Sequence, residues 1–350
     1  MRDLVPSERP LLLLAPMQAI TDLAFMRVME RFGGGPDVYV TEYFRVHEDS
    51  TLERGILRSV VENDTGKPVL AQMIGQSIPD LVRTAQALEA HGVAGVDLNL
   101  GCPAPVVCNK HAGGGLLRRL GHLDNVLGAL RDAVDGRFTV KTRLGYDSPE
   151  EFAQLLKLFA KHAIDGLSIH GRTVAERYRT PVHPKWIREA VRRLSCPVFA
   201  NGNVVSVATG EALLAQTGAA GLIIGRGAIR NPWLFHQLRE WASGDSMAAP
   251  LGPMLVDVHA YVRALYEETK SAVRFHEGKH VQKMKKYLVF IAQGIDADGK
   301  FEHAIRRVTT PEAFWECCDA FLLGQGGQLL AGPPAGSGVF CGHEALLGHL

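Results

Sequence analysis

Eight short runs of apolar residues, each of strand length, recur along the first two thirds of the chain. They begin near residues 11, 38, 69, 95, 138, 166, 197 and 221. Most are followed by apolar residues spaced as on one helix face, at 78–91, 123–134, 149–163, 185–194 and 206–217. Such repeated alternation is typical of an α/β fold, a closed (β/α)8 TIM barrel on a parallel sheet. An open doubly wound sheet is the alternative, but such sheets more often stop at five or six strands.

The alternation stops after residue 232, and three further segments are expected. Residues 1–242 form the predicted barrel domain, and a stretch containing Gly, Pro and Ser at 243–254 is predicted as a linker. Residues 255–323 keep a helical pattern throughout, which predicts a C-terminal all-α domain. Residues 324–350 are rich in Gly, Pro and Ala, which predicts a flexible tail.

Polar or ionisable residues recur where the predicted strands end, while the residues before them are aliphatic. They are Gln18, Glu42, Arg45, Gln72, Asn99, Cys102, Lys141, Arg143, His170, Asn201, Asn203 and Arg226. Each has a structural explanation when taken singly, such as a hydrogen-bonded core histidine for His170. Catalytic groups of a (β/α)8 barrel lie at the C-terminal ends of its strands, so the recurrence favours one common site.

The stretch at residues 96–103, with the sequence VDLNLGCP, is the most informative of these strand ends. A strand-like run ends at Asn99, and Cys102 follows between Gly101 and Pro103. Gly101 permits a tight turn and Pro103 stiffens the exit, so the thiol is expected at the tip of a strand. A small buried side chain beside a proline is the alternative for a lone cysteine.

Glycines at the last two strand ends predict a phosphate site. Gly202 follows the seventh run, and Gly225, Arg226 and Gly227 follow the eighth. These glycines allow a ligand to approach the backbone closely, Arg226 adds a cation, and a helix is expected to start near Ala228.

Composition narrows the compartment and the partners. The 350 residues are 46% hydrophobic and 21% charged with a net charge of +1, so a nucleic-acid contact must come from a local basic patch. No apolar run is long enough to span a membrane and the first residues form no signal peptide, so a cytoplasmic protein is expected. The six cysteines show no disulfide framework, and Cys102, Cys108 and His111 lack the spacing of a zinc site.

The predicted helical domain contains one concentration of positive charge. Lys279, Lys283, Lys285 and Lys286 lie close together, and the first, second and fourth of these share one helix face. A solvated helix face and a surface for RNA phosphates are both open interpretations.

In its motifs and their order, the chain resembles the tRNA-dihydrouridine synthases. The matching segments are 15–17 (APM), Gln72, 97–103 (DLNLGCP), 141–145 (KTRLG), 170–173 (HGRT), 200–202 (ANG) and 224–227 (IGRG). They cover residues 11 to 240, and the helical segment to residue 323 also looks like the family's. Residues 41–46 (TEYFRV) look like the bacterial subgroup that modifies position 16 in the tRNA D-loop.

The resemblance implies a flavoprotein with FMN as its cofactor and NADPH as its electron donor. It places Pro16, Met17 and Gln18 along the isoalloxazine, and Gln72 and Lys141 at its pyrimidine edge. It assigns the flavin side chain and phosphate to His170, Asn201, Gly202, Asn203, Gly225 and Arg226. A cation near the pyrimidine edge stabilises a reduced, anionic flavin, and Lys141 can supply it.

The resemblance also implies an oxidoreductase mechanism in tRNA processing. The target uridine is turned out of the RNA, hydride reaches C6 of the uracil, and Cys102 donates a proton to C5 as general acid. Asn99, Arg143, Tyr178 and Arg45 are the candidate contacts to the base or RNA backbone. The lysine cluster, with Arg172 and Arg177, is expected to contact tRNA phosphates, and the protein is expected to be a monomer.

Two alternatives stay open at this point. Another flavin barrel could use the same cofactor residues to reduce a small molecule, without needing a basic helical domain. A non-catalytic RNA-binding protein could keep the basic surface, although it would not need the complete set of strand-end residues.

Overall fold

The computed structural model describes residues 1–244, 252–270, 277–324 and 328–334, and contains one parallel β-barrel. Its strands are β1 (Leu11–Leu14), β2 (Val38–Val40), β3 (Phe44–Arg45), β4 (Val69–Ile74), β5 (Gly95–Leu100), β6 (Phe138–Arg143), β7 (Gly166–His170), β8 (Val198–Asn201) and β9 (Gly221–Ile224). All pairings are parallel, and β1 pairs with both β2 and β9, while β2 pairs with β4. The short β3 continues the β2 edge along β4, so the sheet closes as an eight-stranded barrel.

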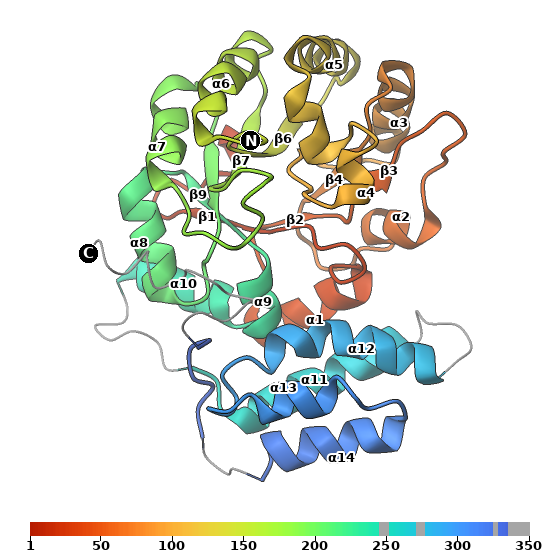
Figure 1. The fold of residues 1–350 in the computed structure, drawn as a ribbon, viewed down its shortest axis with the longest axis vertical. Helices are drawn as coiled ribbons and strands as arrows, with labels where there is room; N and C mark the ends of the chain where they lie inside the picture. Colours follow the sequence, from red (N-terminus) through yellow and green to blue (C-terminus); the bar gives the residue numbers. More distant parts are fainter. Residues whose placement is uncertain (245–251, 271–276, 325–327, 335–350) are drawn as a thin grey trace.

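Helices surround the barrel on its outer side (Figure 1). They are α1 (Leu23–Gly33), α2 (Arg54–Val61), α3 (Ile78–Ala90), α4 (Pro105–Cys108), α5 (Leu120–Ala133), α6 (Phe152–Lys161), α7 (Pro184–Arg193), α8 (Val207–Thr217), α9 (Arg226–Arg230) and α10 (Leu234–Ser243). Three short 3-10 helices, η1 (Arg2–Leu4), η2 (Gly113–Arg118) and η3 (Pro149–Glu151), complete the described part of this domain.

The (β/α)8 fold predicted from the sequence is confirmed. Seven strands begin at the residue where their apolar run begins, and β8 begins one residue later, at Val198. Helices α3, α5, α6, α7 and α8 coincide with the five predicted helical segments, although α5 begins earlier, at Leu120. The helix expected near Ala228 is α9, which begins at Arg226.

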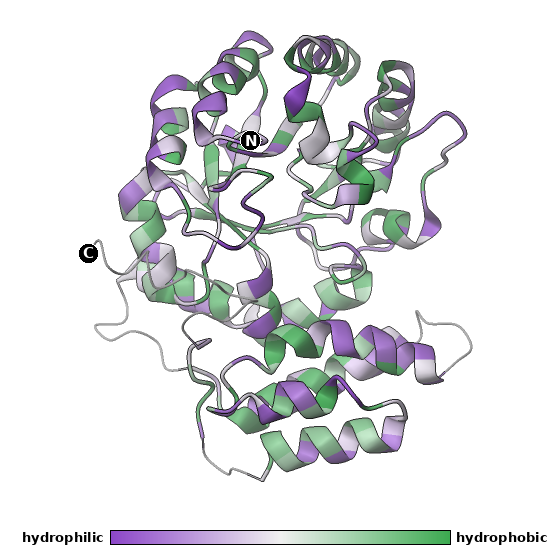
Figure 2. Ribbon diagram, viewed as in Figure 1, coloured by the Kyte–Doolittle hydropathy of each residue, from purple (hydrophilic) through white to green (hydrophobic). Residues whose placement is uncertain are grey.

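Side-chain alternation along the strands divides the barrel core into two layers. Leu12 and Leu14 of β1 pack outward with the helices, whereas Leu11 and Leu13 point into the barrel interior with Phe199. Figure 2 shows that the strands are largely hydrophobic and that hydrophilic positions gather on the outer faces of the helices. The interior is therefore a packed core, and a site is expected at its C-terminal rim.

The C-terminal helices form a separate layer against one side of the barrel (Figure 1). They are α11 (Leu255–Lys270), α12 (Glu277–Ile291), α13 (Lys300–Ile305) and α14 (Pro311–Leu322), with α11 packed on α1 and α12 on α9. No helix in the described ranges is long and apolar enough to cross a membrane.

The predicted linker and tail fall partly outside the described residues. In the part that is described, α10 ends at Ser243, and Met254 of the predicted linker forms an antiparallel bridge with Leu329 of the predicted tail. Residues 245–251 and 335–350 are not described, so the domain boundaries at 243–254 and 324–350 stay predictions.

Candidate active site

A cavity of about 500 Å³ opens at the C-terminal ends of the barrel strands. Segments following β1, β2, β5, β6, β7, β8 and β9 all contribute to its walls. The predicted site residues that line it are Pro16, Met17, Gln18, Asn99, Cys102, Lys141, Arg143, His170, Tyr178, Asn201, Gly202, Asn203, Gly225 and Arg226. The structure thus brings together groups that are more than 200 residues apart in the chain.

Asn99 holds the turn that carries Cys102 into the cavity. Its side-chain oxygen accepts hydrogen bonds from the backbone N–H groups of Gly101 (3.0 Å) and Cys102 (2.9 Å). A short amide side chain that bonds to the backbone two and three residues ahead fixes such a turn. Asn99 therefore has a positioning role that is visible in the structure, in addition to the substrate contact predicted for it.

Gln72 lies behind this turn and does not line the cavity. Its side-chain oxygen accepts a hydrogen bond from Asn99 (2.7 Å), and its amide nitrogen donates to Asp97 (2.7 Å). Asp97 in turn accepts a hydrogen bond from the Thr139 hydroxyl (2.6 Å). All four side chains are buried, so this chain of hydrogen bonds fixes the Asn99 orientation. The flavin contact predicted for Gln72 stays a prediction.

Lys141 supplies a cation at the cavity wall. Its ammonium lies 3.4 Å from the side-chain oxygen of Asn201. Burial and the nearby Arg143 guanidinium lower the pKa of Lys141 to about 8, although the Asp97 carboxylate and Cys102 partly oppose this shift. The lysine is therefore charged at neutral pH but close to its titration range.

His170 is a neutral imidazole at the end of β7. Burial, together with repulsion from Arg143 and Arg172, places the pKa of His170 well below its ordinary value. Its Nδ1 atom is buried and has no hydrogen-bond partner in the described part of the protein. A buried nitrogen of this kind is available to a ligand in the cavity.

The Arg143 side chain makes most of its hydrogen bonds within the protein. The side chain is 2% exposed, and it donates to the carbonyls of Gly101 (2.9 Å), Thr173 (2.8 Å) and Arg177 (2.7 Å). These bonds join the Cys102 turn to the loop after β7. Any RNA contact by Arg143 therefore has to coexist with this structural role.

The glycine-rich end of the cavity follows β8 and β9. Gly202 has φ of +127°, a conformation that favours glycine. Gly225 lies beside the end of β1, where a Cβ atom would be 3.4 Å from both Ala15 and Met17. Arg226 stacks its guanidinium on the Tyr178 ring at 4.5 Å, which places a cation at this end.

Some of the predicted RNA contacts lie elsewhere. Arg172 is fully buried and donates to Asn203 (3.1 Å), and Arg45 lies outside the cavity, 3.7 Å from Glu53. Lys279 and Lys286 are exposed on α12. Lys285 donates to the Val308 carbonyl (3.0 Å). Lys283 faces the barrel, where it pairs with Asp22.

Sequence reasoning overlooked one polar side chain of the cavity. Tyr43, which follows β2, lines the same wall as Cys102, and interaction with Cys102 contributes to a raised pKa of its hydroxyl after the larger effect of burial. Its position just after Thr41 and Glu42 at a strand end was the signal that could have identified it. In the described ranges no group of three or more His, Cys, Asp or Glu side chains could hold a metal.

Comparison with known proteins agrees with the motifs. The family model "Dihydrouridine synthase (Dus)" matches residues 13–324. A "tRNA-dihydrouridine synthase B" from Pseudomonas putida is 35% identical over 68% of this chain and 71% of its own length. A "tRNA-dihydrouridine(16) synthase" from Neisseria meningitidis is 30% identical, covering 75% of this chain and 80% of its own length. A "Probable tRNA-dihydrouridine synthase" from Rhodobacter capsulatus is 31% identical, covering 87% and 92%. The chain therefore belongs to the dihydrouridine synthase family, and the resemblance seen in its motifs is confirmed.

Proposed function

We propose that this protein reduces a uridine of the tRNA D-loop to 5,6-dihydrouridine, with FMN as cofactor and NADPH as electron donor. The observation that carries the proposal is the Cys102 turn, which Asn99 fixes at the wall of a cavity that also contains Lys141 and His170. Family membership supports the reaction, and the names of the relatives support tRNA as the substrate.

The residues of the cavity fit a flavin mononucleotide. The buried Nδ1 of His170 and the buried side-chain oxygen of Gln18 have no protein partner in the described ranges, which leaves both to a ligand. Lys141 would lie at the pyrimidine edge, while Gly202, Asn203, Gly225 and Arg226 would hold the phosphate. When bound, the flavin supplies the hydride that reaches C6 of the uracil.

Cys102 would act as the general acid for the second half of the reduction. Its S–H bond breaks as a C–H bond forms at C5, and the thiolate afterwards recovers a proton from solvent. The C5=C6 double bond is thereby reduced, and NADPH is oxidised. Asn99 and Gln72 would keep the sulfur at a fixed position during this transfer.

Within the D-loop, position 16 is the uridine we propose. Residues 41–46 resemble the corresponding segment of the position-16 subgroup, and the Neisseria relative has that position in its name. The test is mass spectrometry of tRNA treated with the purified protein and NADPH, mapped to the nucleotide. Dihydrouridine at position 16 is expected in RNA, with none formed from free uridine. A colourless protein that binds tRNA, or one that reduces free uridine equally well, would refute the proposal.

Binding of tRNA is expected to depend on salt through the exposed lysines of α12. Each RNA phosphate that a lysine neutralises releases bound counterions and contributes about −0.7 to −0.9 to the slope of log K against log salt concentration. The double variant K279M/K286M should therefore make that slope shallower by about one to two, measured between 50 and 200 mM salt. A slope equal to that of the wild type would exclude these two lysines from the RNA interface.

A further inference from the structure

The first loop of the barrel, residues 15–22, connects β1 with α1 and forms part of the cavity wall. Met17 and Gln18 line the cavity, and four residues later Asp22 caps the N-terminus of α1 by accepting a hydrogen bond from Phe25 (3.1 Å). Ala19, between them, has φ of +62°, which a residue with a Cβ adopts only where its surroundings hold it. The conformation of this loop therefore needs outside support.

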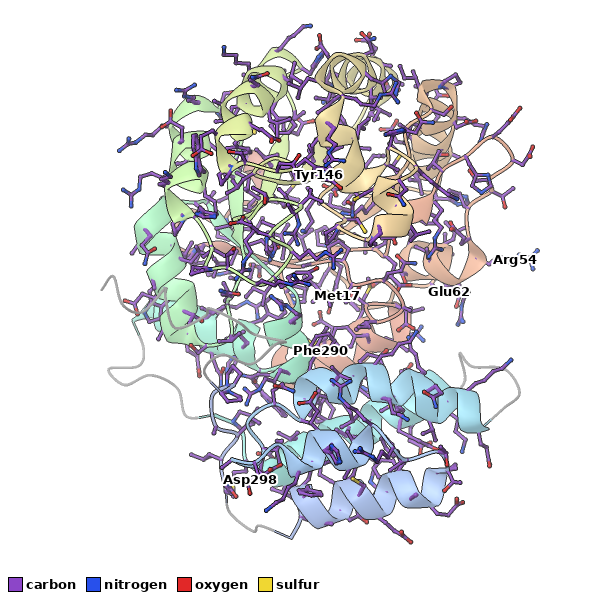
Figure 3. All side chains as sticks on the ribbon, in the orientation of Figure 1. Met17, Arg54, Glu62, Tyr146, Phe290 and Asp298 are labelled. Carbon is purple, nitrogen blue, oxygen red and sulfur yellow. The ribbon has the colours of Figure 1, made fainter. Side chains whose placement is uncertain are left out.

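Helix α12 of the C-terminal domain provides much of that support. The Lys283 ammonium pairs with Asp22 (2.6 Å) and donates to the carbonyl of Ala19 (3.1 Å). One turn further along α12, the Tyr287 hydroxyl donates to the carbonyl of Ile20 (3.0 Å). Figure 3 labels Met17 of this loop on the barrel and Phe290 of α12 in the helical layer next to it.

These contacts are buried, whereas a lysine that binds RNA phosphates has to be exposed to solvent. The Lys283 side chain is only 13% exposed, and its ammonium lies 5.3 Å from the ring of Tyr287. The Tyr287 ring is fully buried and stacks on Phe25 at 5.7 Å. Removing either donor would leave a loop carbonyl without its partner in a place that water reaches poorly.

The barrel side of the loop completes the arrangement. Glu42, buried at the end of β2, accepts a hydrogen bond from the Ile20 N–H (3.0 Å). Thr21 accepts one from the Met17 N–H (2.9 Å), and the Met17 carbonyl accepts from Ile20 and Thr21 (3.0 Å each). A displacement of Ala19 or Ile20 would therefore also move Met17, because Met17 is hydrogen-bonded to Ile20 and Thr21. Since Met17 lines the cavity, the cavity wall would change with it.

We infer that Lys283 and Tyr287 are positioning residues of the active site, through which the helical domain shapes the flavin-facing loop of the barrel. Lys283 then differs in role from Lys279 and Lys286 on the same helix, although all three follow one sequence pattern. The inference rests on the proposed flavin site, because Met17 and Gln18 act on the reaction through the bound cofactor.

Two measurements distinguish a lysine that positions the loop from a lysine that contacts RNA phosphates. They are the affinity for flavin and the salt dependence of tRNA binding. The variant K283M should raise the dissociation constant for flavin about tenfold, because small displacements in a preformed site have effects of this order or larger. Its visible absorption bands should shift, while the salt slope of tRNA binding stays that of the wild type. The double variant K279M/K286M should instead lower the salt slope.

Three further variants make the result specific. K283R should restore flavin affinity to within about threefold, since a guanidinium can bond both Asp22 and the Ala19 carbonyl. Y287F keeps the ring on Phe25 and removes one hydroxyl, so a rise of about threefold is expected even if K283M fails to fold. K300M removes a solvent-exposed ion pair of the same domain, with Asp298, and should behave as wild type.

The outcomes also separate this inference from the proposed function. A wild-type protein that binds no flavin overturns the proposed function. A wild type that binds flavin, together with K283M and Y287F variants of unchanged flavin affinity, overturns the positioning role alone. A K283M variant with normal flavin affinity and a lower salt slope would identify Lys283 as a phosphate contact.

Discussion

Replacing Cys102 with alanine is expected to leave flavin bound while lowering the rate of dihydrouridine formation by about 10²- to 10⁴-fold, the range for loss of a general acid. The turn itself is fixed by the bonds from the backbone N–H groups of Gly101 and Cys102 to Asn99, and the alanine variant keeps both. The cavity should therefore keep its shape in the variant. Single-turnover reduction of tRNA, with the product quantified by mass spectrometry, measures the effect.

A second cysteine variant shows whether the loss is specific to this thiol. Cys196 lies outside the residues that line the cavity, so Cys196→Ala should retain the wild-type rate. The flavin absorption spectrum of both variants checks that the cofactor site is intact. A Cys102→Ala enzyme that turns over at the wild-type rate would remove the thiol from the mechanism.

The barrel was predictable because its strands are short, buried and aliphatic, and their starts follow directly from the apolar runs. The two-residue β3 and helix α2 carry no comparable signal. Strand β3 exists because Phe44 and Arg45 pair with Met73 and Ile74 of β4, a contact that depends on the closed barrel. Local sequence patterns therefore predicted the eight main strands. The short β3 depends on pairing within the closed barrel, which a local pattern does not contain.

The site was predictable as a set of strand ends, but the orientation of each side chain was not. Gln72 and Asn99 both lie near the ends of neighbouring strands, yet only Asn99 lines the cavity. The difference comes from side-chain partners, since Gln72 is held between Asp97 and Asn99. A pattern of residue types places a group at the rim, and the hydrogen-bond network decides whether it faces the ligand.

The lysines of α12 show the same limit at a larger scale. Helical periodicity correctly groups Lys279, Lys283 and Lys286 on one face of a helix. It cannot show that the middle one meets Asp22, 261 residues earlier in the chain, because that contact follows from how the two domains pack. One basic stripe thus contains exposed lysines and one buried ion pair.

Lys141→Met is expected to weaken flavin binding at neutral pH and to remove its dependence on alkaline pH. In the wild type Lys141 is charged below its pKa of about 8 and loses its proton above it. Because a charged ammonium is the stronger hydrogen-bond donor to the acceptor atoms of the flavin's pyrimidine edge, the dissociation constant for flavin should rise with pH above about 8, by at most tenfold per unit. Fluorescence titrations from pH 7 to 9.5 measure this, with Lys157→Met, at an exposed site on α6, as the control that keeps the wild-type profile.

The lowered pKa of Lys141 has the opposite consequence for the stability of the flavin-free protein, which should increase with pH. The folded pKa of about 8 lies below the ordinary 10.5, so between these values the unfolded chain binds more protons than the folded one. Stability should therefore rise with pH across this window in the wild type, and the Lys141→Met variant should lack that rise. The two opposite trends come from one ammonium group, which destabilises the empty cavity and attracts the ligand. Thermal unfolding of flavin-free protein at pH 7, 8 and 9.5 checks the sign, and equal slopes for both proteins would show that Lys141 is not the group that titrates.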